Sequence, residues 1–264
     1  MHGGPKIMYK LNEGLWYYIV EKANNGLEHW EYVFLTVGFA LAAMLAGYLL
    51  GSINSAVILS KVFYRDDIRN HGSGNAGMTN MLRTFGLKAA VFTLLGDLMK
   101  TALAIVIGSI LGGFSYLGGI SVGGLYCDLP LNYIAGFFAV IGHIIPIYHN
   151  FKGGKGVLCT ATLALILTPI EFCILLLVFV AMVAFTKYVS LGSVTVACLY
   201  PLLVFAHYKV IFPGQAMTNG VMMLVLILLA ILIVYCHRGN LDRISNGTER
   251  KISIGGKKKN SEDK

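Results

Sequence analysis

Residues 152–156 read Lys-Gly-Gly-Lys-Gly and stand between two apolar segments. A charged side chain facing lipid at the centre of a bilayer is costly, so this Lys-Gly loop must face water or protein. The glycines Gly153, Gly154 and Gly156 let the backbone approach an anion closely and aim N–H groups at it. Lys155 adds positive charge, and the helix expected next would begin there with free N–H groups. The pattern predicts a phosphate-binding loop at one face of a membrane.

Further residues that could bind phosphate or move a proton occur in separate polar blocks. They are Ser73, Asn75 and Arg83 in one block, Ser193 in a second, and His237 and Asn240 in a third. Taken singly, most are weak candidates, because Gly-Ser-Gly-Asn is typical of a turn and a serine near a helix start is typically a cap. His237 is stronger, since it stands at the boundary of an apolar segment beside other polar residues.

Three more polar residues fall inside apolar segments. Asp97 and Lys100 stand one helical turn apart, which suits either a structural ion pair or a part in the chemistry. The apolar surroundings of His143 favour a structural histidine over a base. The small residues from Gly51 to Ala56 are more typical of helix packing than of a ligand site.

The elements that position these residues must be membrane helices. The chain has 264 residues, of which 56% are hydrophobic and 13% charged, and its mean hydropathy is +0.69. Soluble domains carry about 25% charged residues, so the composition predicts an all-α, polytopic membrane bundle with glycine-rich re-entrant or interfacial loops. The net charge is +8, but the basic residues do not form a domain apart from the apolar segments, which argues against nucleic-acid binding.

Seven apolar segments divide the chain. They cover 33–60, 89–113, 131–149, 157–169, 170–186, 189–208 and 218–236. A span needs about 20 residues, and the short fourth and fifth segments meet at Thr168-Pro169. Two short helices there are favoured over one kinked helix, which gives about seven spans. We expect residues 1–32 to be an N-terminal extension, 33–250 the membrane domain and 251–264 a basic, disordered tail.

The basic residues predict the orientation. With seven spans, sixteen Lys and Arg residues fall in one set of connections and in the C-terminal tail, and four fall in the other set and the N-terminal extension. By the positive-inside rule the richer set is cytoplasmic, with the C-terminus inside and the N-terminus outside. Every polar block then lies on the cytoplasmic face, which suggests one site.

Two other motifs match only in part. The Lys-Gly loop is not a nucleotide-binding P-loop, because Gly156 stands where that motif needs Ser or Thr and His149 replaces its first glycine. His237 and Asp242 have the H-x-x-x-x-D spacing of acyl-CoA-dependent glycerol-phosphate acyltransferases. The second sequence block of that family is missing here, so we rank this alternative lower.

The motifs together resemble a known family, the bacterial acyl-phosphate:glycerol-3-phosphate acyltransferases of the PlsY type. A G-S-x-x-x-A element, a G-S-G-N block followed by arginine, a G-H-x-x-P…F-K-G-G-K-G block and a terminal H-R-x-N block stand in that order. They occupy residues 51–56, 72–83, 142–160 and 237–249. This sequence departs from the pattern at Met78, Leu158 and Cys159. The last two lie on the apolar side of the Lys-Gly loop, where they could change acyl-chain packing.

The resemblance implies an integral membrane enzyme that moves a fatty acyl group from acyl phosphate to the 1-hydroxyl of sn-glycerol 3-phosphate. It implies no cofactor and no metal; the partners would be the two substrates and membrane lipids, without nucleic acid. The implied catalytic residues are Lys155, His237 and Ser73. The implied substrate-binding residues are Arg83, Asn75, Gly153, Gly154, Gly156, Ser193 and Asn240. Either His237 or the substrate phosphate could take the hydroxyl proton.

Two other functional classes would also use a cationic loop. A transporter for a phosphorylated solute would need a matching polar cluster on the opposite face and an inverted repeat, and neither is evident. A lipid-binding scaffold would explain the cations, but not the combination of Ser73, His237 and Asn240.

Overall fold

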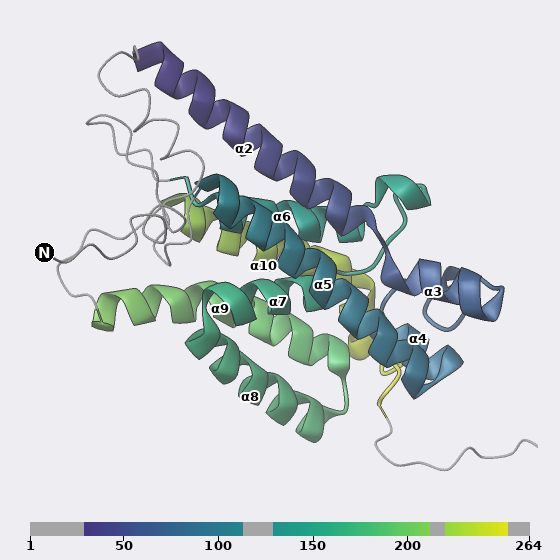
Figure 1. Cartoon of the computed structure of the whole chain (residues 1–264). Helices are drawn as coiled ribbons and strands as arrows, with labels where there is room; N and C mark the ends of the chain where they lie inside the picture. Colours follow the sequence, from purple (N-terminus) through teal and green to yellow (C-terminus); the bar gives the residue numbers. More distant parts are fainter. Residues whose placement is uncertain (1–28, 113–128, 212–219, 253–264) are drawn as a thin grey trace, which may run out of the picture.

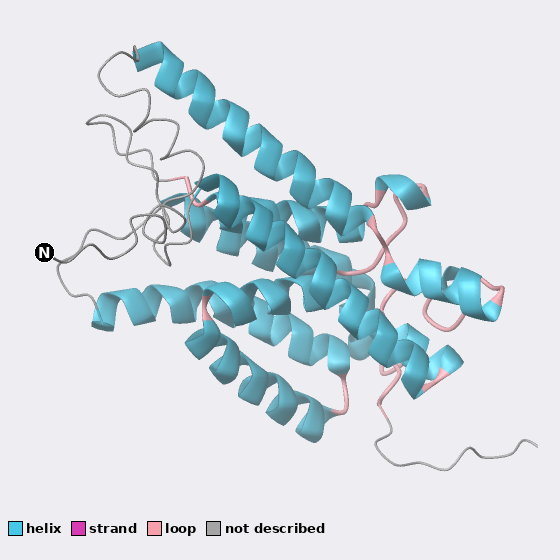
Figure 2. Cartoon of the chain, in the orientation of Figure 1, coloured by secondary structure: helices cyan, strands magenta, loops and turns pink. Residues whose placement is uncertain are grey.

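The computed structural model describes residues 29–112, 129–211 and 220–252, and the regular structure within these ranges is entirely helical (Figures 1 and 2). The α-helices are α2 (His29–Ser52), α3 (Ser55–Tyr64), α4 (Met78–Phe85), α5 (Leu87–Gly112), α6 (Leu131–Ile144), α7 (Val157–Leu167), α8 (Pro169–Thr186), α9 (Val189–Ile211) and α10 (Gly220–Ser245). The short 3-10 helices are η1 (Ile68–Asn70) and η2 (Ile147–His149). The predicted all-α membrane bundle is confirmed. Most of the expected N-terminal extension and basic tail lies outside the described residues.

Within the described residues, six helical stretches are long and apolar enough to cross a membrane. They are α2 continued by α3, α5, α6 continued by η2, α8, α9 and α10. The predicted pair of helices at Thr168-Pro169 is confirmed, with Pro169 in the first turn of α8. However, α7 has only 11 residues. At about 1.5 Å per residue it falls well short of the roughly 30 Å hydrocarbon core. The expected fourth span is therefore a short, largely buried helix that does not cross alone.

The closest helix packing joins α2 to α6, and glycine makes it possible. A Cβ atom built on Gly47 would lie 2.2 Å from the Ala135 carbonyl oxygen, and one on Gly51 would lie 2.1 Å from that of Ala139. Gly142 of α6 meets the α2 backbone in return, where a Cβ would be 2.3 Å from the Tyr48 carbonyl oxygen. Small residues allow such contact between backbones in lipid, where water does not drive helices together. Gly51 is thus a packing residue, as the sequence suggests.

The polar blocks meet at one end of the bundle, where most of the loops lie (Figures 1 and 2). The Arg69 guanidinium donates a 2.9 Å hydrogen bond to the His149 carbonyl oxygen, which joins the α3–α4 and α6–α7 connections. After α10, the chain turns back, and the Ile252 N–H donates to the Lys187 carbonyl oxygen at 2.9 Å. Connections that are remote in sequence therefore build one polar end.

The glycine contacts predict a position-dependent effect of leucine along α2. Gly51→Leu forces side-chain atoms into the α6 backbone and should lower the free energy of unfolding by about 1–3 kcal/mol or more. Gly38→Leu is the matched control, because nothing lies within 4 Å of a Cβ at Gly38. Thermal unfolding of the purified proteins in detergent measures both. Equal stability of the two variants would contradict the assigned α2–α6 packing.

Candidate active site

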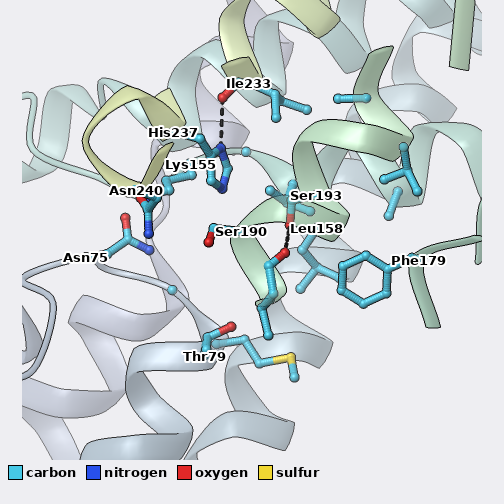
Figure 3. A pocket seen from close by; sticks show the side chains of 18 of the residues that line it. Asn75, Thr79, Lys155, Leu158, Phe179, Ser190, Ser193, Ile233, His237 and Asn240 are labelled. Carbon is cyan, nitrogen blue, oxygen red and sulfur yellow. Dashed lines mark hydrogen bonds between the residues drawn. The ribbon is translucent and has the colours of Figure 1, made fainter. Parts of the chain in front are cut away.

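A cavity of about 700 Å³ opens at the polar end and extends among α7, α8, α9 and α10. Its polar part takes residues from the loop before α4, from the Lys-Gly loop, and from α9, α10 and the segment after α10. Its apolar part is lined by side chains such as Leu158, Phe172, Leu175 and Phe179. Figure 3 shows the two parts, with Lys155 beside Asn240 and His237, and Leu158 beside Phe179. The cavity could accept a ligand that is anionic at one end and apolar at the other.

The loop before α4 takes its shape from Asn80. This side chain is buried, and its amide donates to the carbonyl oxygens of His71 at 2.9 Å and Asn75 at 3.0 Å. Its own oxygen accepts the Ser73 N–H at 3.1 Å. Glycines at positive φ on both sides of Ser73 allow the tight turn. Ser73 and Asn75 consequently reach the cavity wall. The organising role of Asn80 could not be predicted from the sequence, because these contacts exist only in the folded loop.

Lys155 reaches across the cavity to α10. Its ammonium group donates a hydrogen bond to the Asn240 side-chain oxygen. The Asn240 amide donates in turn to the Glu249 carboxylate at 2.6 Å, and the Ser190 hydroxyl donates to the same oxygen at 2.8 Å. Arg243 donates to the other carboxylate oxygen at 2.8 Å. Glu249 and Ser190 were missing from the predicted site. The signal for Glu249 in the sequence was its place as the last residue of the terminal motif at 237–249.

Two cations at the site have lowered pKa values. Burial lowers the pKa of the Lys155 ammonium, as does the positive charge of Arg243, while Glu249 acts in the opposite direction. Partial burial and the charge of Arg250 lower the pKa of Arg83. Burial alone would raise the pKa of Glu249. Hydrogen bonds from Asn240, Ser190 and Arg243 together outweigh burial, so the net pKa is lowered. The polar part is thus cationic, and an incoming anion would relieve repulsion among its cations.

His237 presents one ring nitrogen to the cavity. The ring is buried, and its Nδ1 lies 2.8 Å from the Ile233 carbonyl oxygen, an acceptor that requires the proton on Nδ1. Nε2 is then the nitrogen with a lone pair. Ser193 is buried on the facing helix α9, where its hydroxyl donates to the Val189 carbonyl oxygen at 2.9 Å and keeps acceptor capacity (Figure 3). Both residues line the cavity.

The structure corrects the roles predicted for Gly153 and Gly154. Their N–H groups donate to the carbonyl oxygens of Ile144 at 3.1 Å and His143 at 3.0 Å, so they do not face the cavity as anion donors. Neither residue lines the cavity. A Cβ on Gly153 would lie 2.0 Å from the His143 carbonyl oxygen, and one on Gly154 would lie 2.1 Å from His143 Nε2. These glycines therefore permit close packing under the Lys-Gly loop.

The remaining predicted residues come together as expected. Those lining the cavity are Ser73, Asn75, Arg83, Lys155, Gly156, Ser193, His237 and Asn240. Gly156 adopts φ of +77° directly before α7, a left-handed conformation that glycine enters without strain. Asp97 and His143 also reach the cavity wall, although the sequence left the first undecided and placed the second in a structural role.

Comparison with known proteins decides the family. The family model described as glycerol-3-phosphate acyltransferase matches residues 41–247. A glycerol-3-phosphate acyltransferase of Syntrophomonas wolfei is 44% identical over 212 residues, covering 80% of this chain and 96% of that protein. The chain belongs to the glycerol-3-phosphate acyltransferase family. The resemblance that the motifs indicated is confirmed.

Other members of the glycerol-3-phosphate acyltransferase family agree in length and fold. The Bacillus subtilis glycerol-3-phosphate acyltransferase is 37% identical over 214 residues, covering 81% of this chain and 97% of that one. A crystal structure of PlsY (YgiH), an integral membrane glycerol 3-phosphate acyltransferase in its glycerol 3-phosphate form, matches with a TM-score of 0.67 and 28% identity. That match covers 81% of this chain and 96% of the PlsY chain. Its lysophosphatidic acid form matches with a TM-score of 0.64.

The lowered pKa of Lys155 predicts a pH-dependent affinity for phosphate. Lys155 is a cation below its pKa, so the affinity for inorganic phosphate should fall as pH rises through a value below the usual lysine range. Lys155→Arg keeps the positive charge over that range and should flatten this decline. Calorimetric titration of phosphate into the detergent-solubilised proteins gives both profiles. The same alkaline decline in both proteins would contradict the assignment to Lys155.

Proposed function

We propose that this protein transfers a fatty acyl group from acyl phosphate to the 1-hydroxyl of sn-glycerol 3-phosphate. The products are 1-acylglycerol 3-phosphate and inorganic phosphate, and the reaction is the first step of phospholipid synthesis. The observation that carries the proposal is the single cavity with cations at one end and an apolar slot at the other. The glycerol 3-phosphate and lysophosphatidic acid forms of the PlsY structures support the acceptor and the product.

The proposed reaction assigns a task to each polar wall of the cavity. Arg83 and the Ser73 loop bind the phosphate of glycerol 3-phosphate, and Lys155 binds the phosphate of the donor. The acceptor hydroxyl attacks the carbonyl carbon, and its proton passes to His237 Nε2. The bond from that carbon to the phosphate oxygen then breaks, and the phosphate leaves with the proton. Lys155 stabilises negative charge on the carbonyl oxygen and on the departing phosphate.

The helical geometry of α10 weighs against the H-x-x-x-x-D alternative. Both residues lie on one continuous helix, and five residues at about 100° each place them roughly 140° apart around its axis. His237 Nδ1 donates to Ile233, whereas Asp242 is exposed. The aspartate therefore does not orient the histidine. The nearby arginines have other partners: Arg243 binds Glu249, and Arg238 lies over the Tyr235 ring.

The inner end of the cavity weighs against a transport path. Tyr200 is buried there, and its hydroxyl lies 2.7 Å from that of Thr168. This contact ties α9 to the junction of α7 and α8 beside the slot. We further propose that the open polar end faces the cytoplasm, because the basic connections lie on that side. Labelling a single cysteine at position 74 in intact and in permeabilised cells tests this orientation.

The donor can be tested together with the role of Asp242. We expect turnover with acyl phosphate and none with acyl-CoA or acyl-carrier protein, because the cationic loop suits a compact phosphate leaving group. Asp242→Ala should retain most of the activity, and Lys155→Ala should lose nearly all of it while staying folded. Steady-state assays of the purified proteins measure all three effects. Efficient use of acyl-CoA, together with an inactive but folded Asp242→Ala variant, would favour the alternative mechanism.

The apolar slot predicts control of acyl-chain length from α7. Ala164 is buried and lines the slot, whereas the neighbouring Leu165 is exposed. Ala164→Phe should fill the slot and lower kcat/KM for palmitoyl phosphate relative to decanoyl phosphate by about tenfold, the equivalent of roughly 1.4 kcal/mol. Leu165→Phe serves as the control. Competition assays with both donors give the ratio, and an unchanged ratio in Ala164→Phe would place the chain elsewhere.

A further inference from the structure

A buried charged cluster lies beneath the Lys-Gly loop. It consists of Asp97 and Lys100 of α5 and His143 of α6, which are 1%, 4% and 4% exposed. The Lys100 ammonium lies 2.9 Å from an Asp97 carboxylate oxygen and 2.9 Å from His143 Nδ1. It also donates to the Ile53 carbonyl oxygen at 2.8 Å. These contacts use all three N–H donors of the ammonium group, so its hydrogen-bonding capacity is fully satisfied within the cluster.

The cluster forms where two breaks in helical structure meet, the α2–α3 junction and the Lys-Gly loop. Ile53 lies between the end of α2 and the start of α3, which explains why its carbonyl is open to Lys100. Ser55, at the start of α3, donates to the Asp97 carboxylate at 3.1 Å. The second break is the Lys-Gly loop, where the Gly154 N–H donates to the His143 carbonyl oxygen at 3.0 Å. The cluster thus links α2–α3, α5 and α6 to the loop that carries Lys155.

The imidazole of His143 supports this loop directly. Because Nδ1 accepts a hydrogen bond from Lys100, the ring proton is on Nε2, at the edge that faces Gly154. That edge is so close that a Cβ on Gly154 would lie 2.1 Å from Nε2. The Ala76 carbonyl oxygen of the Ser73 loop lies near the same point, at 2.9 Å from that Cβ position. The residue before Lys155 therefore packs closely against both the ring and the Ser73 loop.

We infer that His143, held by Lys100 and Asp97, is a positioning residue that sets the place of Lys155 through Gly154. The inference rests on the proposed function only in taking Lys155 as a phosphate ligand. A long side chain that must meet both Asn240 and a ligand depends on where its backbone starts, and small misplacements of a catalytic group are costly. The ion pair with Asp97 holds the Lys100 ammonium group, and the hydrogen bond from Lys100 orients the His143 ring. The ring in turn packs against Gly154 and holds the Lys-Gly loop.

The decisive variant is His143→Asn. The asparagine side-chain oxygen can take the place of Nδ1 and accept the Lys100 hydrogen bond, but the shorter side chain leaves Gly154 unsupported. We expect this variant to fold, and to bind inorganic phosphate about tenfold more weakly than the wild type, the loss typical of one displaced charged hydrogen bond. In the Lys155→Ala background the same substitution should change phosphate affinity by less than about twofold, because the group it positions is absent.

The experiment is a double-mutant cycle on phosphate affinity, measured by calorimetry on the full-length proteins in detergent. His207→Asn is the matched control, since His207 Nδ1 pairs with Glu171 at 2.5 Å elsewhere in the bundle. It should lower thermal stability without changing phosphate affinity. If His143→Asn does not fold, Gly154→Ala replaces it, because a methyl group there forces the loop and the ring apart without substituting any residue of the charged cluster.

The outcomes separate the positioning role from the proposed function. Wild-type phosphate affinity in folded His143→Asn, or an equal loss with and without Lys155, would overturn the positioning role alone. Unchanged affinity in Lys155→Ala would reject the phosphate site and the positioning role together. A tenfold loss that depends on Lys155 supports the inference. The kinetic counterpart is a lower kcat with the KM for glycerol 3-phosphate nearly unchanged, because Arg83 lies on a different element.

Discussion

The Glu249 carboxylate organises the polar end of the cavity. It accepts hydrogen bonds from Ser190 of α9 and from Asn240 and Arg243 of α10, and Asn240 passes the connection on to Lys155. Without this anion, four cations (Arg83, Lys155, Arg243 and Arg250) would repel one another more strongly across one partly desolvated space. Glu249 therefore allows positive charge to accumulate at a membrane boundary before any substrate arrives. It also ties the segment after α10 to the helix that it follows.

The opposite side of the site depends on close packing. Glycines bring the α2 and α6 backbones together, and Gly153 and Gly154 bring the Lys-Gly loop onto the end of α6. A buried ion cluster at this junction joins the helix breaks by hydrogen bonds, which satisfy polar groups that lipid could not. The site thus has one wall fixed by backbone contact and another held by a carboxylate. Between them lies the cavity, whose apolar part is bounded by the short α7.

Much of this arrangement follows from the sequence because charge and helix length obey simple constraints in a membrane. The apolar segments, the break at Thr168-Pro169 and the gathering of polar blocks are of this kind. The sequence could not show that the Gly153 and Gly154 N–H groups are consumed by carbonyl oxygens, since glycine suits both an anion site and close packing. It could not show that Asn80 shapes the Ser73 loop or that Glu249 joins Asn240, because these contacts depend on tertiary structure. The short α7 was counted as a span because composition does not distinguish a buried helix from a spanning one.

The lowered pKa of Lys155 bears on how the proposed reaction would be accelerated. A cation held in a partly desolvated site interacts more strongly with a nearby anion than one in water does. In the proposed transfer, negative charge grows first on the carbonyl oxygen and then on the leaving phosphate, both within reach of the same ammonium group. A fixed, partly buried lysine then stabilises the transition state more than the bound donor, which is the condition for faster chemistry. Phosphate leaves readily under these conditions, so the cavity needs no nucleophilic side chain to carry the acyl group. The rate of the proposed transfer therefore depends on the position of the Lys155 ammonium group and not on its charge alone. Both walls of the site hold that group in position.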